Sequence, residues 1–300
     1  MRFTIFLLVL FCNTFLCSQD YIDLLTISVG DTPLTNFDAA SGSYRIKSLD
    51  ANILIPVPLS ERTALMTGIN GFVNRLKITP KQAEIGLFSY GFQLGLNRTY
   101  TNGWSSTHLL IPRITSAFEQ DRSSLQWGMA NLIQHKVGNR STWGTGLYIN
   151  TEEQGLMLVP LLLFFTRSER GSWEFNTLFP ARADFTFNLQ NSLRVGLGFE
   201  GLGNSFAANL KEYGSVYIQR SSMEFSSYLQ YPLTKNILLN LRGGYGLFRR
   251  FRIFEADDTV KFSLMNIFFK DPRTPLNQSV QDGPFFNLRL IYRYYLPKKN

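Results

Sequence analysis

The sequence predicts an all-β protein, a transmembrane antiparallel up-and-down β-barrel of twelve to fourteen strands, with fourteen slightly favoured. Apolar and polar residues alternate with period two along most of the chain. Charged residues make up only 17% of it and aromatic residues 14%, whereas soluble domains carry roughly 25% charge. No apolar run reaches the length of about 20 residues that a membrane-spanning helix needs. Together with an export signal, these features leave a membrane barrel or, as the alternative, a soluble secreted β protein.

The export signal occupies residues 1–18. Met1 and Arg2 give a positive start, residues 3–11 are almost wholly apolar, and a more polar stretch precedes Gln19. We expect cleavage there, which leaves residues 19–300 as a single barrel domain. Both cysteines, Cys12 and Cys17, would be removed, so the mature chain would have no disulfide or thiolate chemistry. Lipidation of Cys17 is the competing hypothesis, but Leu16 is large for the position before a lipidated cysteine.

The strands follow from the alternation, which is clearest in residues 286–294. Phe286, Leu288 and Leu290 fall on one face there, and Asn287 and Arg289 on the other. The same pattern marks residues 88–96, 193–200, 223–231 and 237–247. The polar face is rich in Gly, Ser, Asn, Gln and Arg rather than Lys, Glu and Thr. Small, hydrogen-bonding side chains suit the inside of a barrel better than a water-facing sheet.

Six short turns are predicted, at residues 59–62, 100–104, 138–143, 168–173, 189–192 and 233–236. Trp104, Trp143 and Trp173 follow three of them at equivalent places, as expected if these turns share one membrane interface. Residues 77–82, 119–123, 203–214 and 255–283 are less regular and are predicted to be the extracellular loops. If each of the six short turns joins two strands, and one further strand lies at each end of the domain, the barrel has fourteen strands. One strand instead of two around Pro180, without a strand at 21–29, gives twelve.

Three segments carry a family resemblance: WEFNTLFPARAD at 173–184, LRVGLG at 193–198 and YPLTKN at 231–236. Over residues 48–296 the chain resembles a family of uncharacterised outer-membrane β-barrel proteins of Gram-negative bacteria, a domain-of-unknown-function family. The resemblance implies the cell outer membrane as the location, and it brings no catalytic or ligand residues. The expected partners are outer-membrane lipid, lipopolysaccharide and the outer-membrane assembly machinery. Many such barrels end on an aromatic residue, whereas this chain continues past Tyr295 through Pro297.

Charged residues on the inward faces of four successive predicted strands are the strongest functional signal. These residues are Arg194, Glu200, Glu224, Arg242, Arg289 and Arg293. Charges of both signs inside a barrel either close a salt-bridge network that plugs it or line a pore with an electric field. Arg249, Arg250 and Arg252 form a predicted extracellular basic rim that would pair with lipopolysaccharide phosphates. A nucleic-acid partner is not expected, because no binding module accompanies these charges.

The favoured function is passive: a channel or carrier for small solutes, or a structural barrel. The alternative is an outer-membrane lipid hydrolase that uses Ser106, His108 and His135, with Asn131 close by in sequence. No cofactor is expected. The two histidines cannot alone form a three-ligand metal site. The glycine spacing at 196–201 matches a dinucleotide motif but lies within an alternating strand rather than before a helix.

Overall fold

The structure, a computed structural model, describes residues 21–36, 43–78, 84–117, 122–189, 193–265, 267, 271–278 and 280–296. The proposed signal peptide at 1–18 lies outside these residues. The strands are β1 (Tyr21–Asn36), β2 (Ser43–Pro58), β3 (Thr63–Leu76), β4 (Ile85–Thr99), β5 (Trp104–Ala117), β6 (Ser123–Val137), β7 (Ser141–Glu152), β8 (Gly155–Arg167), β9 (Trp173–Phe179), β10 (Arg182–Asn188), β11 (Arg194–Leu210), β12 (Gly214–Pro232), β13 (Ile237–Glu255), β14 (Phe262–Leu264) and β15 (Gly283–Tyr295). A 3₁₀ turn, η1 (Thr101–Gly103), joins β4 to β5.

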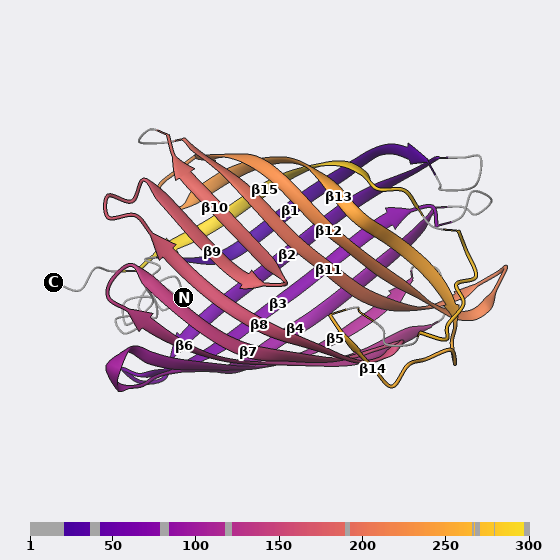
Figure 1. The fold of residues 1–300 in the computed structure, drawn as a ribbon, viewed down its shortest axis with the longest axis horizontal. Helices are drawn as coiled ribbons and strands as arrows, with labels where there is room; N and C mark the ends of the chain where they lie inside the picture. Colours follow the sequence, from indigo (N-terminus) through magenta and orange to yellow (C-terminus); the bar gives the residue numbers. More distant parts are fainter. Residues whose placement is uncertain are drawn as a thin grey trace, which may run out of the picture.

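The strands form one closed antiparallel barrel (Figure 1). Neighbours along the chain pair with each other, β1 pairs with β15, and β15 pairs with β13. The pairing of β8 with β9 completes the circle. The short β14 runs parallel to β8 and is additional to the wall. The wall therefore has fourteen strands, and the favoured strand count is confirmed. The first strand at 21–29 and the two short strands around Pro180 are confirmed with it.

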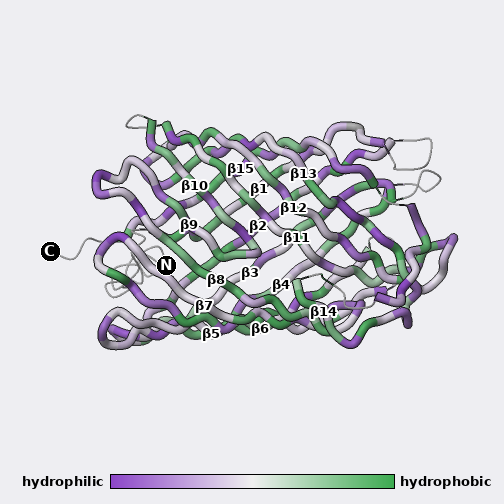
Figure 2. The backbone as a smooth tube through the Cα atoms, in the orientation of Figure 1, coloured by the Kyte–Doolittle hydropathy of each residue, from purple (hydrophilic) through white to green (hydrophobic). Residues whose placement is uncertain are grey.

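The outer face of the barrel is apolar. Phe92, Leu162, Leu197 and Leu288 are all exposed on it, each two positions from another apolar residue, and so is Ile69. Figure 2 shows hydrophilic residues gathered at both ends and hydrophobic residues through the body of the barrel. A closed sheet with such a belt satisfies its backbone hydrogen bonds inside lipid. The chain is thus an outer-membrane barrel. Among the described residues, no helix is long and apolar enough to span a membrane.

The two ends of the barrel differ as the sequence predicts. All six short turns lie at one end, where Tyr21 also pairs with Tyr295 close to the termini. The longest connection, between β13 and β15, lies at the other end. Short turns mark the periplasmic side of such barrels, and longer loops mark the extracellular side. Trp104 and Trp143 pack edge to face at the periplasmic end, with ring centroids 5.7 Å apart, which agrees with the predicted interfacial position.

One predicted loop is wrong. Residues 203–214 are not irregular, because β11 continues to Leu210, only residues 211–213 turn, and β12 begins at Gly214. Ser205, Phe206, Ala207 and Ala208 are all fully buried. A strand packed on both faces shows no alternation of apolar and polar residues, so the period-two signal is lost there. The extracellular half of β11 stays paired with β12 as far as Leu210, but it bends into the lumen and touches β4, β5 and β6 on the opposite side.

β11 bends into the lumen because the β9–β10 hairpin is too short to pair with its extracellular half. β8 pairs with β9 only over residues 162–167, and β10 pairs with β11 only over residues 194–200. Above the hairpin tip at Pro180, the wall between β8 and β11 has no ladder within the described residues. We call this interruption the wall break. Pro160, which lacks a backbone donor, lies just beyond the last β9-paired residue of β8, as expected for a strand edge.

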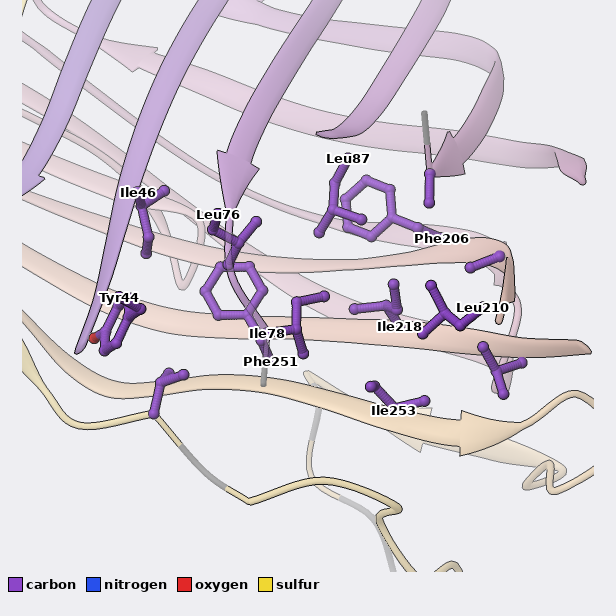
Figure 3. Close-up of a cluster of buried hydrophobic side chains, with 14 residues drawn as sticks. Tyr44, Ile46, Leu76, Ile78, Leu87, Phe206, Leu210, Ile218, Phe251 and Ile253 are labelled. Carbon is purple, nitrogen blue, oxygen red and sulfur yellow. The ribbon is translucent and has the colours of Figure 1, made fainter. Parts of the chain in front are cut away.

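The extracellular half of the barrel contains an apolar core (Figure 3). Phe206 of β11 packs there with the Phe72 ring of β3 at 5.8 Å between centroids. Leu76 and Leu87 extend the core on that wall, and Ile218 and Ile253 on the other. In β13, a bulge at Phe248, with a positive φ of 53°, shifts the inward parity so that Phe251 and Ile253 point inward. This core closes the extracellular end of the lumen.

Replacement of Phe206 by Ala should destabilise the barrel by about 3–5 kcal/mol, because a buried ring is lost and protein surrounds the cavity that remains. Urea unfolding of the folded protein in lipid vesicles, followed by Trp fluorescence, measures this. Phe225→Ala is the matched control, since Phe225 is 47% exposed on the outer face, where lipid chains refill the space. Equal losses for the two variants would show that the Phe206 cluster does not act as a packed core.

Candidate functional site: the barrel lumen

An ion-paired cluster lies on the inner face of β10, β11, β13 and β15. The Arg242 guanidinium contacts the carboxylates of Asp184, at 3.1 Å, and Glu200, at 3.4 Å. Arg289 donates to the same Glu200 at 3.0 Å. The Arg242 guanidinium also lies over the Tyr228 ring, 4.6 Å from its centroid. Four of these side chains thus form one chain of alternating charge across neighbouring strands. A buried charge is retained only with such partners.

Three of the inward charges named from the sequence, Arg194, Glu224 and Arg293, lie outside this cluster. Glu224 lies beside it, and with Glu200, Arg242 and Arg289 it lines a small cavity of about 20 Å³. Arg293 instead pairs with Asp23 of β1 at 2.6 Å, close to the periplasmic end.

A cavity of about 540 Å³ occupies the periplasmic end of the lumen. It is lined by inward side chains of the wall, among them Arg194, Gln230 and Tyr295, and by the β8–β9 turn with Arg170. We call this cavity the vestibule. Nearby, the Tyr21 hydroxyl of β1 reaches Glu174 of β9 and donates a hydrogen bond to it. Arg194 is therefore placed at the periplasmic entrance, away from the Arg242 cluster.

A buried carboxylate holds the displaced half of β11 in the lumen. Glu152 Oε2 accepts hydrogen bonds from the Ser205 backbone N–H at 2.7 Å and from its hydroxyl at 2.5 Å. Its other oxygen accepts from Asn150 Nδ2 at 2.6 Å and from the Arg113 guanidinium. Gln126 completes the group, since Nε2 donates to the Ser205 carbonyl at 3.2 Å. We call these five residues the latch. No pattern in the sequence predicted the latch. Its only signal is the acidic Glu152 at the otherwise uncharged end of β7.

The inner face of the barrel is apolar on one side. From β5 to β9 the inward residues include Leu109, Ile111, Leu132, Val159 and Leu163, all half-buried. In β8, apolar residues point both inward and outward, so that segment shows no alternation. The alternation that predicts a polar inner face covers other strands and does not extend to β8. The lumen therefore has a charged cluster on β10 to β15 and an apolar patch on β5, β6 and β8, which we call its apolar side. The latch lies beside this patch, on β5, β6 and β7.

The predicted basic rim is divided by the structure. Arg249 is not exposed at the rim, because the bulge at Phe248 turns it inward, where it is 3% exposed and donates to the Gly283 carbonyl at 3.1 Å. Arg250 is exposed, and Arg252 is half-buried.

Farther along the β13–β15 loop, a second arginine holds the chain against the barrel. Arg273 donates to Asp271 at 2.8 Å and to the Tyr217 hydroxyl at 2.9 Å. The hydrogen bond from Arg273 lowers the pKa of the Asp271 carboxyl below its usual value. This contact joins the loop to β12.

The candidate hydrolase residues all lie on the outer face of β5 and β6. His108 Nδ1 lies 2.8 Å from Asn131 Oδ1, and Ser106 is on the same side of β5. His135 is not close to His108, because it stands opposite Trp104 in the register, roughly 13 Å farther along at 3.3 Å per residue. Its ring packs on Trp104 at 4.6 Å between centroids. The Ser106 hydroxyl contacts the Tyr100 hydroxyl at 3.0 Å rather than His108.

No group of three or more metal-ligating side chains occurs among the described residues.

A protein-family profile matches most of the chain. Residues 45–293 match the profile of a domain of unknown function, DUF6268. The chain belongs to this family. The match confirms the resemblance inferred from the turn and strand motifs, and it covers the same part of the sequence. No curated protein matches the chain significantly.

Solved structures with a similar fold are membrane barrels of low sequence identity. The COG4313 outer membrane channel from Pseudomonas putida F1 is 8% identical with a TM-score of 0.44, over 91% of this chain and 96% of that one. The Pseudomonas putida toluene transporter TodX is 8% identical with a TM-score of 0.42, over 91% and 89%. The translocator domain of autotransporter NalP from Neisseria meningitidis is 9% identical with a TM-score of 0.34, over 91% and 89%.

Proposed function

We propose that this barrel is a passive channel for small solutes that rests closed at its extracellular end and open to the periplasm through the vestibule. The observation that carries the proposal is the nature of the closure. The lumen is blocked by a strand segment, residues 201–210, that stays paired with β12, and on the far side of the lumen a few hydrogen bonds and one ion pair hold it. A purely structural barrel has no need of a latch that can be released. Charges of both signs on the inner wall provide successive binding partners for an ion or a polar solute that passes through the lumen.

Release of the latch should open the channel. Glu152→Gln removes the charge that compensates buried Arg113, which costs about 3–5 kcal/mol in comparable buried pairs. We expect rare or no openings of wild-type residues 19–300 in planar lipid bilayers, and at least about tenfold higher open probability for the variant. Glu212→Gln, at the exposed β11–β12 turn, is the control and should behave like wild type. If both proteins insert and neither conducts, the barrel is structural.

Arg194 should influence ion selectivity, because it lines the vestibule. In the Glu152→Gln background, Arg194→Glu should shift the reversal potential in a salt gradient toward cation preference, since it exchanges a positive charge for a negative one at the entrance. Arg62→Glu adds the same charge change at a periplasmic turn outside the vestibule, and it should shift the potential much less. Equal shifts would mean that general surface charge, not the lumen, sets the preference.

The basic rim takes a smaller part in this proposal. Arg250 and Arg252 lie at the extracellular end of β13, where lipopolysaccharide phosphates are within reach of guanidinium groups. Arg249 is left out of this contact because its side chain points into the barrel.

A lipid hydrolase is the second candidate function, because the His108–Asn131 pair faces the membrane together with Ser106. An oriented imidazole beside a serine is the arrangement that acyl transfer requires. If the enzyme exists, release of fatty acid from phospholipid vesicles should fall at least about a hundredfold in His108→Ala and remain in His135→Ala. Absence of hydrolysis by the wild-type protein would eliminate this function. The channel is better supported, since Tyr100 rather than His108 contacts the Ser106 hydroxyl.

A further inference from the structure

The wall break lies at the depth of the membrane hydrocarbon. β9 and β10 have 7 residues each, whereas a membrane-spanning strand takes about 9–11. β9 begins at Trp173, one of the interfacial tryptophans, so the hairpin tip stops short of the opposite interface. Phe179 at the tip is 51% exposed on the outer face and stacks with Phe199 at 6.4 Å between centroids. Above these two rings, the edges of β8 and β11 do not pair with each other, so the sheet is not continuous there.

A segment of the β13–β15 loop descends along the edge of β8 at this break. We call residues 260–265, which include β14, the strap. Its Val260 N–H donates to the Gln154 carbonyl at 2.8 Å, and its Met265 N–H donates to the Leu158 carbonyl at 3.0 Å. Phe262 at the centre of the strap is 50% exposed. The strap thus satisfies part of the β8 edge with its own backbone.

The contact between strap and barrel is incompletely satisfied. The Ser263 hydroxyl and both polar atoms of the Gln154 side chain are buried with no hydrogen-bond partner among the described residues. A buried polar group without a partner costs about 1–3 kcal/mol. Movement of the strap away from β8 would expose these groups to partners, which offsets part of the loss of its short ladder with β8 and of the two flanking backbone hydrogen bonds. The strap is therefore held less firmly than the rest of the wall.

The apolar side of the lumen reaches the wall break. Val159 and Leu163 of β8 point inward beside it, and Leu163 is paired with Leu178 of β9. Leu109 and Leu132 continue the same surface across β5 and β6. The ion-paired cluster around Arg242 lies on the opposite side, on β10 to β15. A solute that passes the break from the membrane therefore meets only apolar side chains on β8.

We propose that the barrel exchanges small apolar solutes between the membrane hydrocarbon and the apolar side of its lumen, through the wall break, with the strap as the cover. This inference rests on the proposed channel function and names its substrate class. Polar solutes are excluded from this route because they would lose their hydration in lipid without compensating hydrogen bonds. A solute would then pass the wall break at the membrane end of this path and the charged vestibule at the periplasmic end.

A lipid-dissolved photoreactive probe tests the route. An iodophenyl trifluoromethyl diazirine, which partitions into the bilayer, is irradiated with the full mature protein in phospholipid vesicles, and labelled residues are mapped by mass spectrometry. We expect labelling of outward Leu162 and also of inward Val159 and Leu163. Labelled Leu162 with unlabelled Val159 and Leu163 would overturn the inference, because the lumen would then be sealed from lipid.

A disulfide that fixes the strap tests its role. Met157 and Ser263 are register partners and are both buried, so Met157→Cys/Ser263→Cys can join the strap to β8. Oxidation should reduce inward labelling at least about tenfold, leave Leu162 unchanged, and be reversed by a reductant. The matched control is Val73→Cys/Phe88→Cys, a register pair in the wall between β3 and β4. Inward labelling that is insensitive to the strap disulfide would overturn the inference.

The two proposals fail separately. Absence of current through the Glu152→Gln variant, together with strap-dependent labelling, would remove the axial channel and leave the lateral route. Current through this variant with no inward labelling would remove the lateral route and leave the axial channel.

Discussion

The structure depends on the requirement that backbone polar groups in lipid must be satisfied by the protein itself. Eleven of the fourteen interfaces in the wall meet this requirement with long antiparallel ladders, and the three that involve β9 or β10 are short, that between β8 and β9 covering only residues 162–167 of β8. Because the β9–β10 hairpin is short, the upper edges of β8 and β11 are left without partners. β11 resolves this by turning into the protein, where Glu152 and Gln126 supply partners to Ser205. β8 resolves it with the strap. The latch, the apolar core and the strap thus share one cause.

The distribution of charge inside the barrel follows from the same asymmetry. β10 to β15 carry Asp184, Glu200, Arg242 and Arg289 on their inner faces, and their mutual pairing compensates the cost of burial. Parts of β5, β6 and β8 carry aliphatic side chains instead, next to the latch. The lumen is consequently amphipathic across its width, so the ion pairs do not fill it as a plug. They occupy one wall and leave the other free for apolar contact.

The periodicity of the sequence predicts the strands of the barrel wall but not the segments that fill the lumen. The six turns and the phasing of Trp104, Trp143 and Trp173 predict fourteen strands correctly, because each depends on local chemistry at an interface. Residues 203–210 were misjudged because both faces of that part of β11 are packed, which removes alternation. The separation of His108 from His135 could not be read from sequence either. Register across a hairpin depends on where its loop closes, and a shift of a few residues moves a side chain by several ångströms. The Glu152 latch joins β5, β6, β7 and β11, and no local pattern encodes a contact of that range.

Closure of the extracellular end and interruption of the wall are consequences of one strand position. Residues 201–210 of β11 can pair along a lengthened β10 side or lie against Gln126 and Glu152 in the lumen, and they cannot do both. In the described arrangement the mouth is blocked by Phe206 and its neighbours while the side of the barrel lacks a ladder. The closed extracellular end and the wall break therefore depend on the same segment of β11, and the buried Glu152 carboxylate binds that segment at Ser205.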